Sequence, residues 1–292
     1  MLKYIIFLFI FLNSLIYSFS QVNFTKNKFQ GTISFIELPD RLIETSGLIY
    51  FNGLLWTFND SGGLPIIFGI SPQNGEILQK VKIKNGRNFD WEDIAQDEKY
   101  IYIGDIGNNY NNRKKLKIYK ILKSNITSDK RIKLMSEIIT YSYSDQIDYK
   151  INRIPSFDCE ALTSYNDSLL LFTKDWNDFN TSVYILSKNS VEQKANKIAV
   201  LNVNSLITGA EIINDEGIIL LSGRNNMYPL ILVLKYINNN NKMTFNDGVI
   251  YEMPFLKGSQ IEAITYANGT IYISSEKSLN PQRIYKISNF NF

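Results

Sequence analysis

Carboxylate side chains recur at the ends of short apolar segments. The stretch DWEDIAQDEKYIYIGDIGNN (90–109) carries Glu92 just before one apolar run and Asp105 at the end of the next. Related stretches follow Glu160, Glu211 and Glu262. Carboxylate and amide oxygens are the ligands that Ca²⁺ takes in proteins, and a carboxylate can also act as a general base. These positions are therefore candidates for a metal or catalytic site.

The acidic positions belong to an internal repeat. When Ser46, Glu92, Glu160, Glu211 and Glu262 are placed in one register, they recur at intervals of 46, 68, 51 and 51 residues. After each anchor comes a short apolar segment and then a turn rich in Asn, Asp and Gly, which is typical of a tight hairpin. The second strands of these hairpins are predicted at LLWTF (54–58), YIYIG (100–104), LLLFT (169–173), IILLS (218–222) and TIYIS (270–274).

Third and fourth strands complete the first four units, but the fifth unit has no fourth strand. The segment GTISFIELP (31–39) precedes the first unit and is predicted to pair with QRIYKIS (282–288) as the missing strand. The pattern predicts an all-β fold, a β-propeller of five four-stranded blades closed by this N-terminal strand. Six blades are the alternative because the second unit is longer, and a β-sandwich is a further one. Residues 289–292 are expected to be dispensable for folding.

The N-terminal sequence and the composition indicate where the protein is found and which catalytic and metal sites it cannot contain. Residues 1–20 resemble a secretory signal peptide, which leaves 21–292 as one domain that is secreted or periplasmic, with no later transmembrane segment. The formal net charge of +3 is small and scattered, so nucleic acid is not an expected partner. The chain has no histidine and one cysteine, Cys159, which excludes Ser-His-Asp and Cys-His catalysis, histidine metal sites and an internal disulfide.

In a propeller, the starts of the innermost strands and the loops between second and third strands meet on one rim. The tentative metal ligands there are Glu92, Glu160, Glu211, Glu262, Asp60 and Asp105. The ligand-binding candidates are Asn59, Asp60, Asp105, Asn108, Asn109, Arg113, Lys174, Asp175, Arg224 and Asn225, with Asp105 and Asp175 as candidate catalytic bases. Converging carboxylates repel one another, so a cation such as Ca²⁺, protonation, the side chains of Lys174 and Arg224, or hydrogen bonds between blades must offset their charge.

Three stretches and one residue resemble a group of secreted Bacteroidetes-type propeller proteins: SGLIYFNGLLWTFNDSGG (46–63), DWEDIA (90–95), GDIGNN (104–109) and Arg113. More loosely, the Glu-led inner strand with rim Asp and Asn resembles the calcium-dependent gluconolactonase, paraoxonase and phytase-like esterase propellers. That resemblance implies a Ca²⁺ ion held by the channel glutamates with Asn59, Asp60 and Asp105. The chain departs from these families because they usually have six blades and paraoxonases employ histidines.

Three functions stay open at this stage. The first is a binding module that holds a small molecule, glycan or envelope protein on the acidic rim, with Trp56, Trp91 and Trp176 as possible stacking surfaces. The second is a calcium-dependent hydrolase of lactone or phosphoester substrates. In the third, the acids only join the blades. The protein is expected to be a monomer.

Overall fold

The computed structural model describes residues 22–226, 228–239 and 242–292, so the predicted signal peptide lies outside the described residues. The described part is almost entirely strand and loop. Its helical elements are the short 3-10 turns Asp40–Leu42, Lys123–Asn125, Asn214–Glu216 and Pro254–Leu256. Within these ranges, no helix has the length and apolar character needed to cross a membrane.

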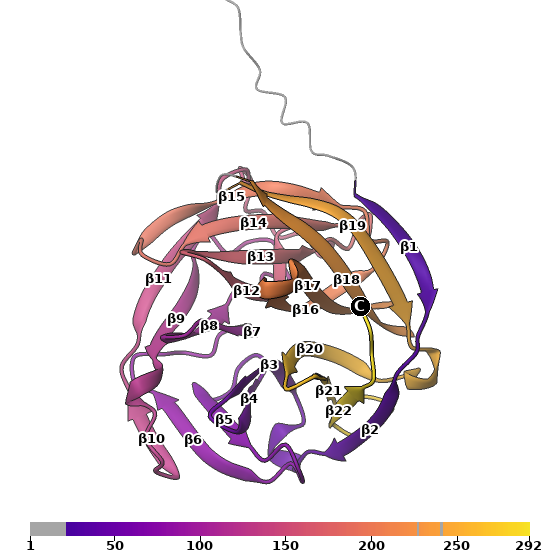
Figure 1. Ribbon diagram of the computed structural model, residues 1–292. Helices are drawn as coiled ribbons and strands as arrows, with labels where there is room; N and C mark the ends of the chain where they lie inside the picture. Colours follow the sequence, from indigo (N-terminus) through magenta and orange to yellow (C-terminus); the bar gives the residue numbers. More distant parts are fainter. Residues whose placement is uncertain (1–21, 227, 240–241) are drawn as a thin grey trace, which may run out of the picture.

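Antiparallel pairing arranges most strands into groups of four, each beginning near the centre of the molecule (Figure 1). Group 1 contains β3 (Thr45–Phe51), β4 (Leu54–Asn59), β5 (Ile66–Ile70) and β6 (Ile77–Ile83). Group 2 contains β7 (Trp91–Gln96), β8 (Tyr100–Asp105), β9 (Leu116–Leu122) and β11 (Glu137–Tyr143). Group 3 contains β12 (Asp158–Tyr165), β13 (Ser168–Lys174), β14 (Thr181–Ser187) and β15 (Glu192–Leu201). Group 4 contains β16 (Leu206–Ile213), β17 (Ile218–Asn225), β18 (Tyr228–Asn239) and β19 (Lys242–Glu252), and group 5 contains β20 (Gln260–Ala267), β21 (Thr270–Glu276), β22 (Arg283–Ser288) and β2 (Thr32–Glu37).

The innermost strands form a closed ring. Strand β3 contacts β7, β7 contacts β12, β12 contacts β16, β16 contacts β20, and β20 returns to β3. Figure 1 shows the groups arranged radially around this ring. The architecture is therefore all-β and propeller-like, as the repeat predicts.

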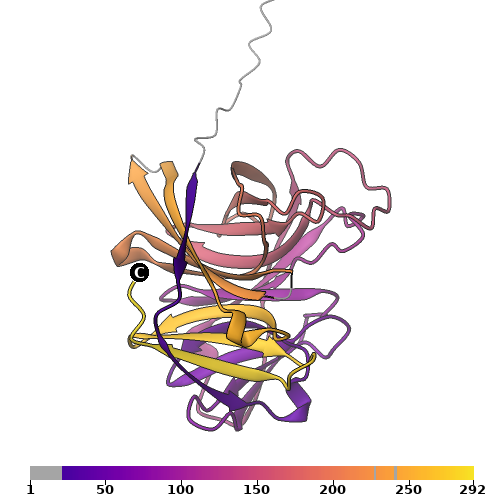
Figure 2. The same ribbon diagram turned by 90° about the vertical axis from the view of Figure 1, so that its right-hand side faces the viewer.

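The N-terminal strand completes the last group. Strand β2 pairs antiparallel with β22 from Thr32 opposite Ser288 to Glu37 opposite Arg283. This confirms the predicted pairing of the two ends of the chain. Before it, β1 (Asn23–Lys28) adds a parallel strand to β19, so the N-terminal segment crosses from group 4 to group 5 (Figure 2).

The longer second interval of the repeat has a structural explanation. Its extra residues form β10 (Arg131–Leu134), which pairs in parallel with β6 on the outer side of group 1. Strand β11 then pairs in parallel with β15, and this joins groups 2 and 3 into one eight-stranded sheet. The insertion therefore bridges groups 1 and 2, and β11 bridges groups 2 and 3, both at the outer edges.

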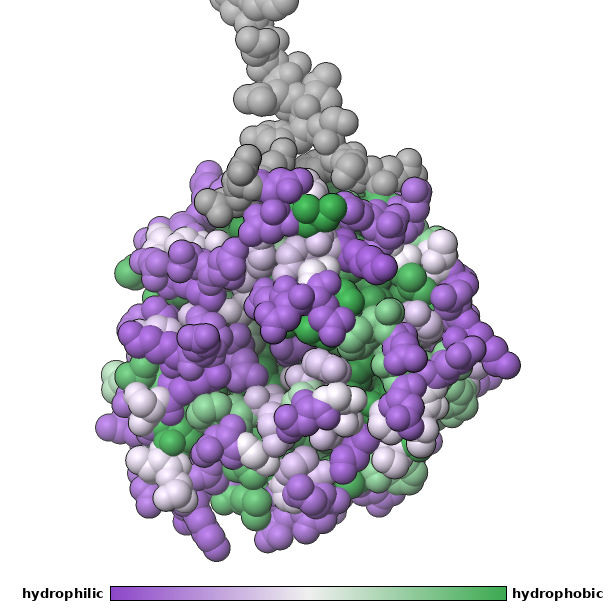
Figure 3. Space-filling model, in the orientation of Figure 1, coloured by the Kyte–Doolittle hydropathy of each residue, from purple (hydrophilic) through white to green (hydrophobic). Residues whose placement is uncertain are grey.

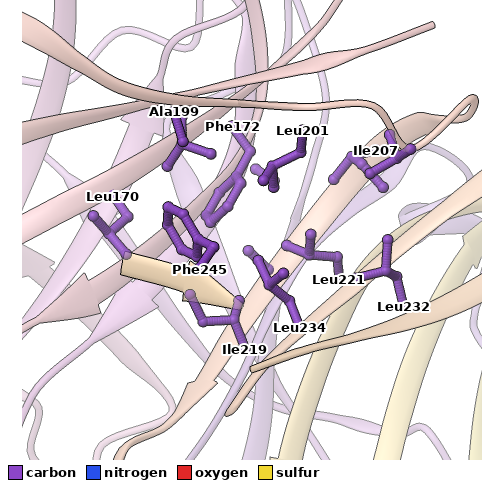
Figure 4. Packing of buried hydrophobic residues seen from close by; sticks show 14 of the residues in the cluster. Leu170, Phe172, Ala199, Leu201, Ile207, Ile219, Leu221, Leu232, Leu234 and Phe245 are labelled. Carbon is purple, nitrogen blue, oxygen red and sulfur yellow. The ribbon is translucent and has the colours of Figure 1, made fainter. Parts of the chain in front are cut away.

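Hydrophobic core clusters lie at the junctions between consecutive groups. Figure 4 shows one of them, where Leu170 and Phe172 of group 3 face Ile219 and Leu234 of group 4. Another, between groups 1 and 2, buries Trp56 and Trp91 completely. These two tryptophans are packing residues and cannot serve as the predicted stacking surfaces.

The C-terminal residues also pack, although the sequence predicts that 289–292 are dispensable for folding. The ring of Phe290 lies 4.9 Å from that of Tyr251 and 5.5 Å from that of Phe29, measured between centroids. Phe292 lies 5.5 Å from Tyr266. The short sequence NFNF gives no periodicity from which this packing could be inferred, and the small cost of trimming 289–292 stays a prediction. On the face seen in Figure 1, hydrophilic residues prevail and hydrophobic ones are scattered (Figure 3).

Candidate metal centre

A β-bulge in each innermost strand sets the direction of its side chains. In β7 the pairing shifts between Trp91 and Ile94, in β12 around Glu160, and in β20 around Glu262. A bulge places an extra residue on one strand and re-aims the side chains beside it. Glu92, Glu160 and Glu262 therefore hold matching positions in three groups.

The same register corrects two anchors of the predicted repeat. In β16 the bulge lies between Ile207 and Gly209, so Thr208 occupies the position predicted for Glu211. Glu211 is three residues further along and accepts a hydrogen bond from Thr265 Oγ1 at 3.0 Å. In β3 the bulge begins after Ser46, so Gly47 takes the corresponding position there. The sequence alignment failed in these two strands because Thr208 and Gly47 stand where the other three strands carry Glu, so no carboxylate marks the bulge.

Asp60, Asp90 and Glu92 form the centre of the candidate site. One carboxylate oxygen from each lies within 4.8 Å of the others, although they come from the end of β4, the segment before β7, and β7 itself. Gly107 makes room for them, since a Cβ at this position would collide with Glu92 Oε1 and Asp90 Oδ2. Only glycine lets the backbone approach these oxygens so closely.

A second carboxyl pair, Asp158 and Glu160, lies beside this triad. Asp158 is fully buried; its Oδ1 accepts from the backbone N–H of Asn108 at 2.6 Å, while Oδ2 accepts no hydrogen bond from the part of the chain that the structure describes. Glu160 Oε1 is 2.6 Å from Lys174 Nζ. We use "acid cluster" for the triad, this pair, and two half-buried neighbours, Glu262 and Glu276.

Burial and mutual repulsion raise the pKa values of the carboxyl groups in the acid cluster. Burial and the charge of Glu160 raise the pKa of Asp60 to about 7, and burial likewise raises the pKa of Asp90 to about 6, although Arg113 opposes this. Burial and neighbouring carboxylates raise the pKa of Glu262 to about 8 and that of Glu276 to about 7.

The pKa values of the two most buried acids, Glu92 and Asp158, are raised further. The pKa of Glu92 lies well above its ordinary value because of burial and then the charge of Glu160. The pKa of Asp158 is also raised well above its usual range by burial and Glu160.

Lys174 is the buried cation of the cluster. Burial alone would lower the pKa of Lys174, but the charges of Glu160 and Asp158 raise it above the ordinary value. One ammonium offsets one of these carboxylates, so most of the negative charge of the cluster stays uncompensated by Lys174.

Asp105 is engaged by an arginine. Arg113 donates from its guanidinium to Asp105 Oδ1 at 2.7 Å and also to the carbonyl oxygen of Gly107. Asn108 supports this arrangement by accepting from the backbone N–H of Arg113 at 2.9 Å. Burial still raises the pKa of Asp105, against the opposing charge of Arg113. Asp105 and Arg113 thus form an ion pair next to the triad, and Arg113 lies on the acidic rim as predicted.

The remaining predicted residues surround the acid cluster at different depths. Asn109 Nδ2 donates to Asp90 Oδ2 at 3.3 Å, and Asn59 donates to the carbonyl oxygen of Arg41 at 2.8 Å while its own Oδ1 is buried without a donor. Asp175 accepts from Asn177 N–H within its own loop, which leaves it outside the triad.

Arg224 lies on the same rim. Its charge lowers the pKa of Glu276 against the larger effect of burial, and its guanidinium carbon is 6.0 Å from the centre of the Trp176 ring. Asn225 pairs with Tyr228 at the β17–β18 turn. Trp176 is half-exposed, with Lys174 Nζ 5.3 Å from its ring centre, so it is the tryptophan that can still contact a ligand.

Sequence reasoning did not assign Asp90 and Asp158 to the site. Both stand two residues before a bulge glutamate, in the motifs DWE (90–92) and DCE (158–160). Side chains two residues apart on a strand share a face. The repeated D-x-E pattern was the signal that could have identified them.

Comparison with known proteins supports the fold and leaves the family open. No family model matches the chain, and no curated protein matches it. The crystal structure of Myxococcus xanthus glutaminyl cyclase aligns over 89% of this chain and 97% of its own, with a TM-score of 0.54 and 14% identity. At that identity the likeness concerns the propeller-like fold alone.

Two further solved structures align less well. The "Putative exported protein" of Bacteroides fragilis covers 93% of this chain and 100% of its own at 10% identity, with a TM-score of 0.44. The computationally designed Ika4 protein covers 68% and 96% at 8% identity, with a TM-score of 0.35. The resemblance to gluconolactonase-type propellers stays a prediction.

Proposed function

We propose that the chain is an exported five-bladed propeller whose acid cluster binds a divalent cation, with Ca²⁺ as the favoured ion. The observation that carries this proposal is the convergence of Asp60, Asp90 and Glu92 to within 4.8 Å. Two ligand oxygens of one Ca²⁺ can be separated by up to about 5 Å, because each Ca–O distance is about 2.3–2.6 Å. The three carboxylates fit one such ion.

Electrostatics also favour a cation. Two carboxylates 4 Å apart repel by about 4 kcal/mol at an effective dielectric constant of 20. Protonation offsets this repulsion in the metal-free protein, which is consistent with the raised pKa values of Asp60 and Asp90. A divalent ion would offset it without protons.

The donor set favours Ca²⁺ over other metals. The cluster offers carboxylate oxygens, with the amide oxygen of Asn59 adjacent in the chain, and it contains neither histidine nor cysteine. Structural Zn²⁺ sites are built mainly from nitrogen and sulfur, whereas Ca²⁺ accepts oxygen ligands in flexible geometry. Mg²⁺ requires near-octahedral ligands, which this irregular group supplies less readily.

The surroundings of the ion suit a binding module. Asp60 and Asp90 are only half-buried, so an ion between them could keep coordination positions for a ligand. Asn109 contacts Asp90 with its amide, and the ring of Trp176 lies next to Lys174, which is paired with Glu160 of the acid cluster. We infer that the ligand is a small molecule, a glycan or an envelope protein, held by a monomeric protein in the periplasm or outside the cell.

The calcium-dependent hydrolase receives less support. Of its two candidate bases, Asp105 is held by Arg113 and Asp175 accepts a hydrogen bond inside its own loop. Asp105 is thus paired with a cation, and neither carboxylate belongs to the triad that would hold the ion.

Titration calorimetry with CaCl₂ tests the proposal. Glu92→Gln keeps the shape of the side chain but removes one ligand charge, so its Ca²⁺ affinity should fall at least tenfold. Glu98→Gln is the matched control, because it removes an exposed carboxylate from the turn at the other end of the β7–β8 hairpin and should change affinity less than twofold. Absence of Ca²⁺ binding to the wild type, or equal affinity in Glu92→Gln, would contradict the site.

A further inference from the structure

The insertion in the second repeat unit places cations opposite cations on the outer part of group 1. Strand β10 lies beside β6 at this edge (Figure 1). The parallel register sets Arg131 directly opposite Lys80 and Lys133 directly opposite Lys82. Side chains that are directly opposite share one face of a sheet, and like charges in such positions are destabilising. These four side chains are therefore contiguous, and we call them the basic face.

Protection of a sheet edge explains only half of this arrangement. Lysine and arginine on an edge strand discourage pairing with another chain, so Arg131 and Lys133 suit the outermost strand, β10. Lys80 and Lys82 belong to β6, whose edge β10 already covers. Edge protection therefore gives no reason for their charge.

No carboxylate neutralises the basic face within the described ranges. None of its four side chains forms an ion pair there. On the other side of β6, the residues opposite Lys80 and Lys82 are the apolar Phe68 and Ile66 of β5. Arg41 brings a further cation, because its guanidinium carbon lies 5.8 Å from the centre of the Phe68 ring and Lys80 Nζ lies 5.9 Å from the same centre.

The acids at the ends of these strands are matched by other cations. Glu137, which follows β10, is paired with Lys120 at 3.1 Å, and Glu37 is paired with Arg283 at 3.0 Å. The remaining carboxylates on the adjoining segments are Asp40, Glu76 and Asp129, and the cations on the same segments are Arg41, Lys84 and Lys130. The charge of the basic face is thus left uncompensated.

The surroundings of Lys80 show the same imbalance. Burial lowers the pKa of Lys80, and the positive charges of Arg41 and Arg131 lower it further, with no carboxylate opposing them. Three of the four side chains of the basic face are exposed and Lys80 is half-buried, so an anion from solution can reach them.

We propose that the basic face binds a linear acidic polysaccharide. Neighbouring strands lie about 4.8 Å apart, and residues two positions apart on a parallel strand are separated by about 6.6 Å. One carboxylate or sulfate group can therefore accept hydrogen bonds from both cations of an opposite pair, and a second charged group of the same polymer can contact the next pair. This inference does not depend on cation binding by the acid cluster.

A polysaccharide is favoured over single-stranded nucleic acid. Proteins that hold single strands combine a basic groove with exposed aromatic rings on which the bases stack. The aromatic ring beside the basic face, Phe68, is only 5% exposed.

Fluorescence anisotropy with labelled heparin, a sulfated polysaccharide, tests the proposal in excess chelator, which separates it from the metal site. The wild type should bind, and binding should weaken as NaCl is raised. Lys82→Gln/Lys133→Gln removes one opposite pair and should lower the affinity at least fivefold. Its melting temperature should be no lower than that of the wild type, because the variant loses repulsion between like charges.

Lys194→Gln/Lys235→Gln is the matched control, since it removes the same charge from exposed positions in groups 3 and 4 and should change the affinity less than twofold. No binding of heparin to the wild type, or equal affinity in Lys82→Gln/Lys133→Gln, would overturn the proposal. An equal loss in the control would also overturn it, because total charge would then explain binding. Displacement of labelled heparin by poly-dT or phosphatidylglycerol vesicles at lower charge concentration than by unlabelled heparin would identify a different partner and contradict the polysaccharide.

Discussion

Glu92 and Asp93 are neighbours in β7 and both are buried, yet their surroundings differ completely. Asp93 accepts from the backbone N–H groups of Ile94 at 2.8 Å, Leu162 at 2.8 Å and Ala210 at 3.3 Å. It therefore connects β7 to β12 and β16. Glu92 faces Asp60 and Asp90 instead.

The difference separates two uses of a buried acid. Burial raises the pKa of both carboxyl groups. For Asp93 the backbone donors oppose that shift, whereas for Glu92 the neighbouring carboxylates add to it. An acid surrounded by donors joins strands, and an acid surrounded by acids requires a cation or protons. Of the explanations for the buried acids, inter-blade hydrogen bonding thus applies to Asp93, and cation binding is proposed for the triad.

The largest expected effect is on stability at the donor-rich acid. Asp93→Ala would leave three buried N–H groups without their acceptor, at about 1–3 kcal/mol each, so the free energy of unfolding should fall by at least 3 kcal/mol. Urea unfolding in the presence of chelator measures this fall in the free energy of unfolding. Glu92→Gln is the comparison variant and should change stability by less than about 1 kcal/mol, since it loses repulsion rather than donors. Equal losses of unfolding free energy in Asp93→Ala and Glu92→Gln would contradict the different roles assigned to the two acids.

A smaller change in the free energy of unfolding is expected when the pH is raised. Asp60, Asp90, Glu262 and Glu276 have folded-state pKa values of about 7, 6, 8 and 7, above their ordinary values of 3.8 for Asp and 4.5 for Glu. The folded state therefore binds more protons between about pH 4 and pH 8, and stability must fall as the pH rises through that window.

Urea unfolding in chelator at pH 5 and pH 8 measures this dependence. After allowance for solvent screening, we expect the metal-free protein to be about 2 kcal/mol less stable at pH 8. Asp60→Asn/Asp90→Asn should flatten the dependence. Stability that rises from pH 5 to pH 8 would mean that the acids are paired with donors, as Asp93 is.

The sequence predicts the fold better than the site. Strand periodicity and the turn residues identify the groups of strands, and the missing fourth strand after QRIYKIS identifies β2. The arrangement of Glu92 and Glu160 also follows from the repeat. Glu211 was misplaced because the bulge position of β16 carries Thr208 instead of a glutamate, so no carboxylate marks the register there.

The hydrogen-bond partners of the individual acids in β7 could not be predicted. Nothing in DWED distinguishes Glu92 from Asp93, because their different roles depend on β12 and β16, which follow in the chain by more than 60 residues. The tryptophans were ambiguous for the same reason: Trp91 is covered by Tyr119 and Phe58, from different groups, whereas Trp176 is not buried.

The central claim is that the triad holds a cation, and thermal melting of the wild-type protein with excess Ca²⁺ and with chelator tests it most directly. At a Ca²⁺ concentration one hundred times the dissociation constant, binding to the folded state alone should stabilise the protein by about 2.7 kcal/mol. For a chain of this size that corresponds to a rise in melting temperature of about 2–4 °C for each 1 kcal/mol. Identical melting curves in the two conditions would contradict the account.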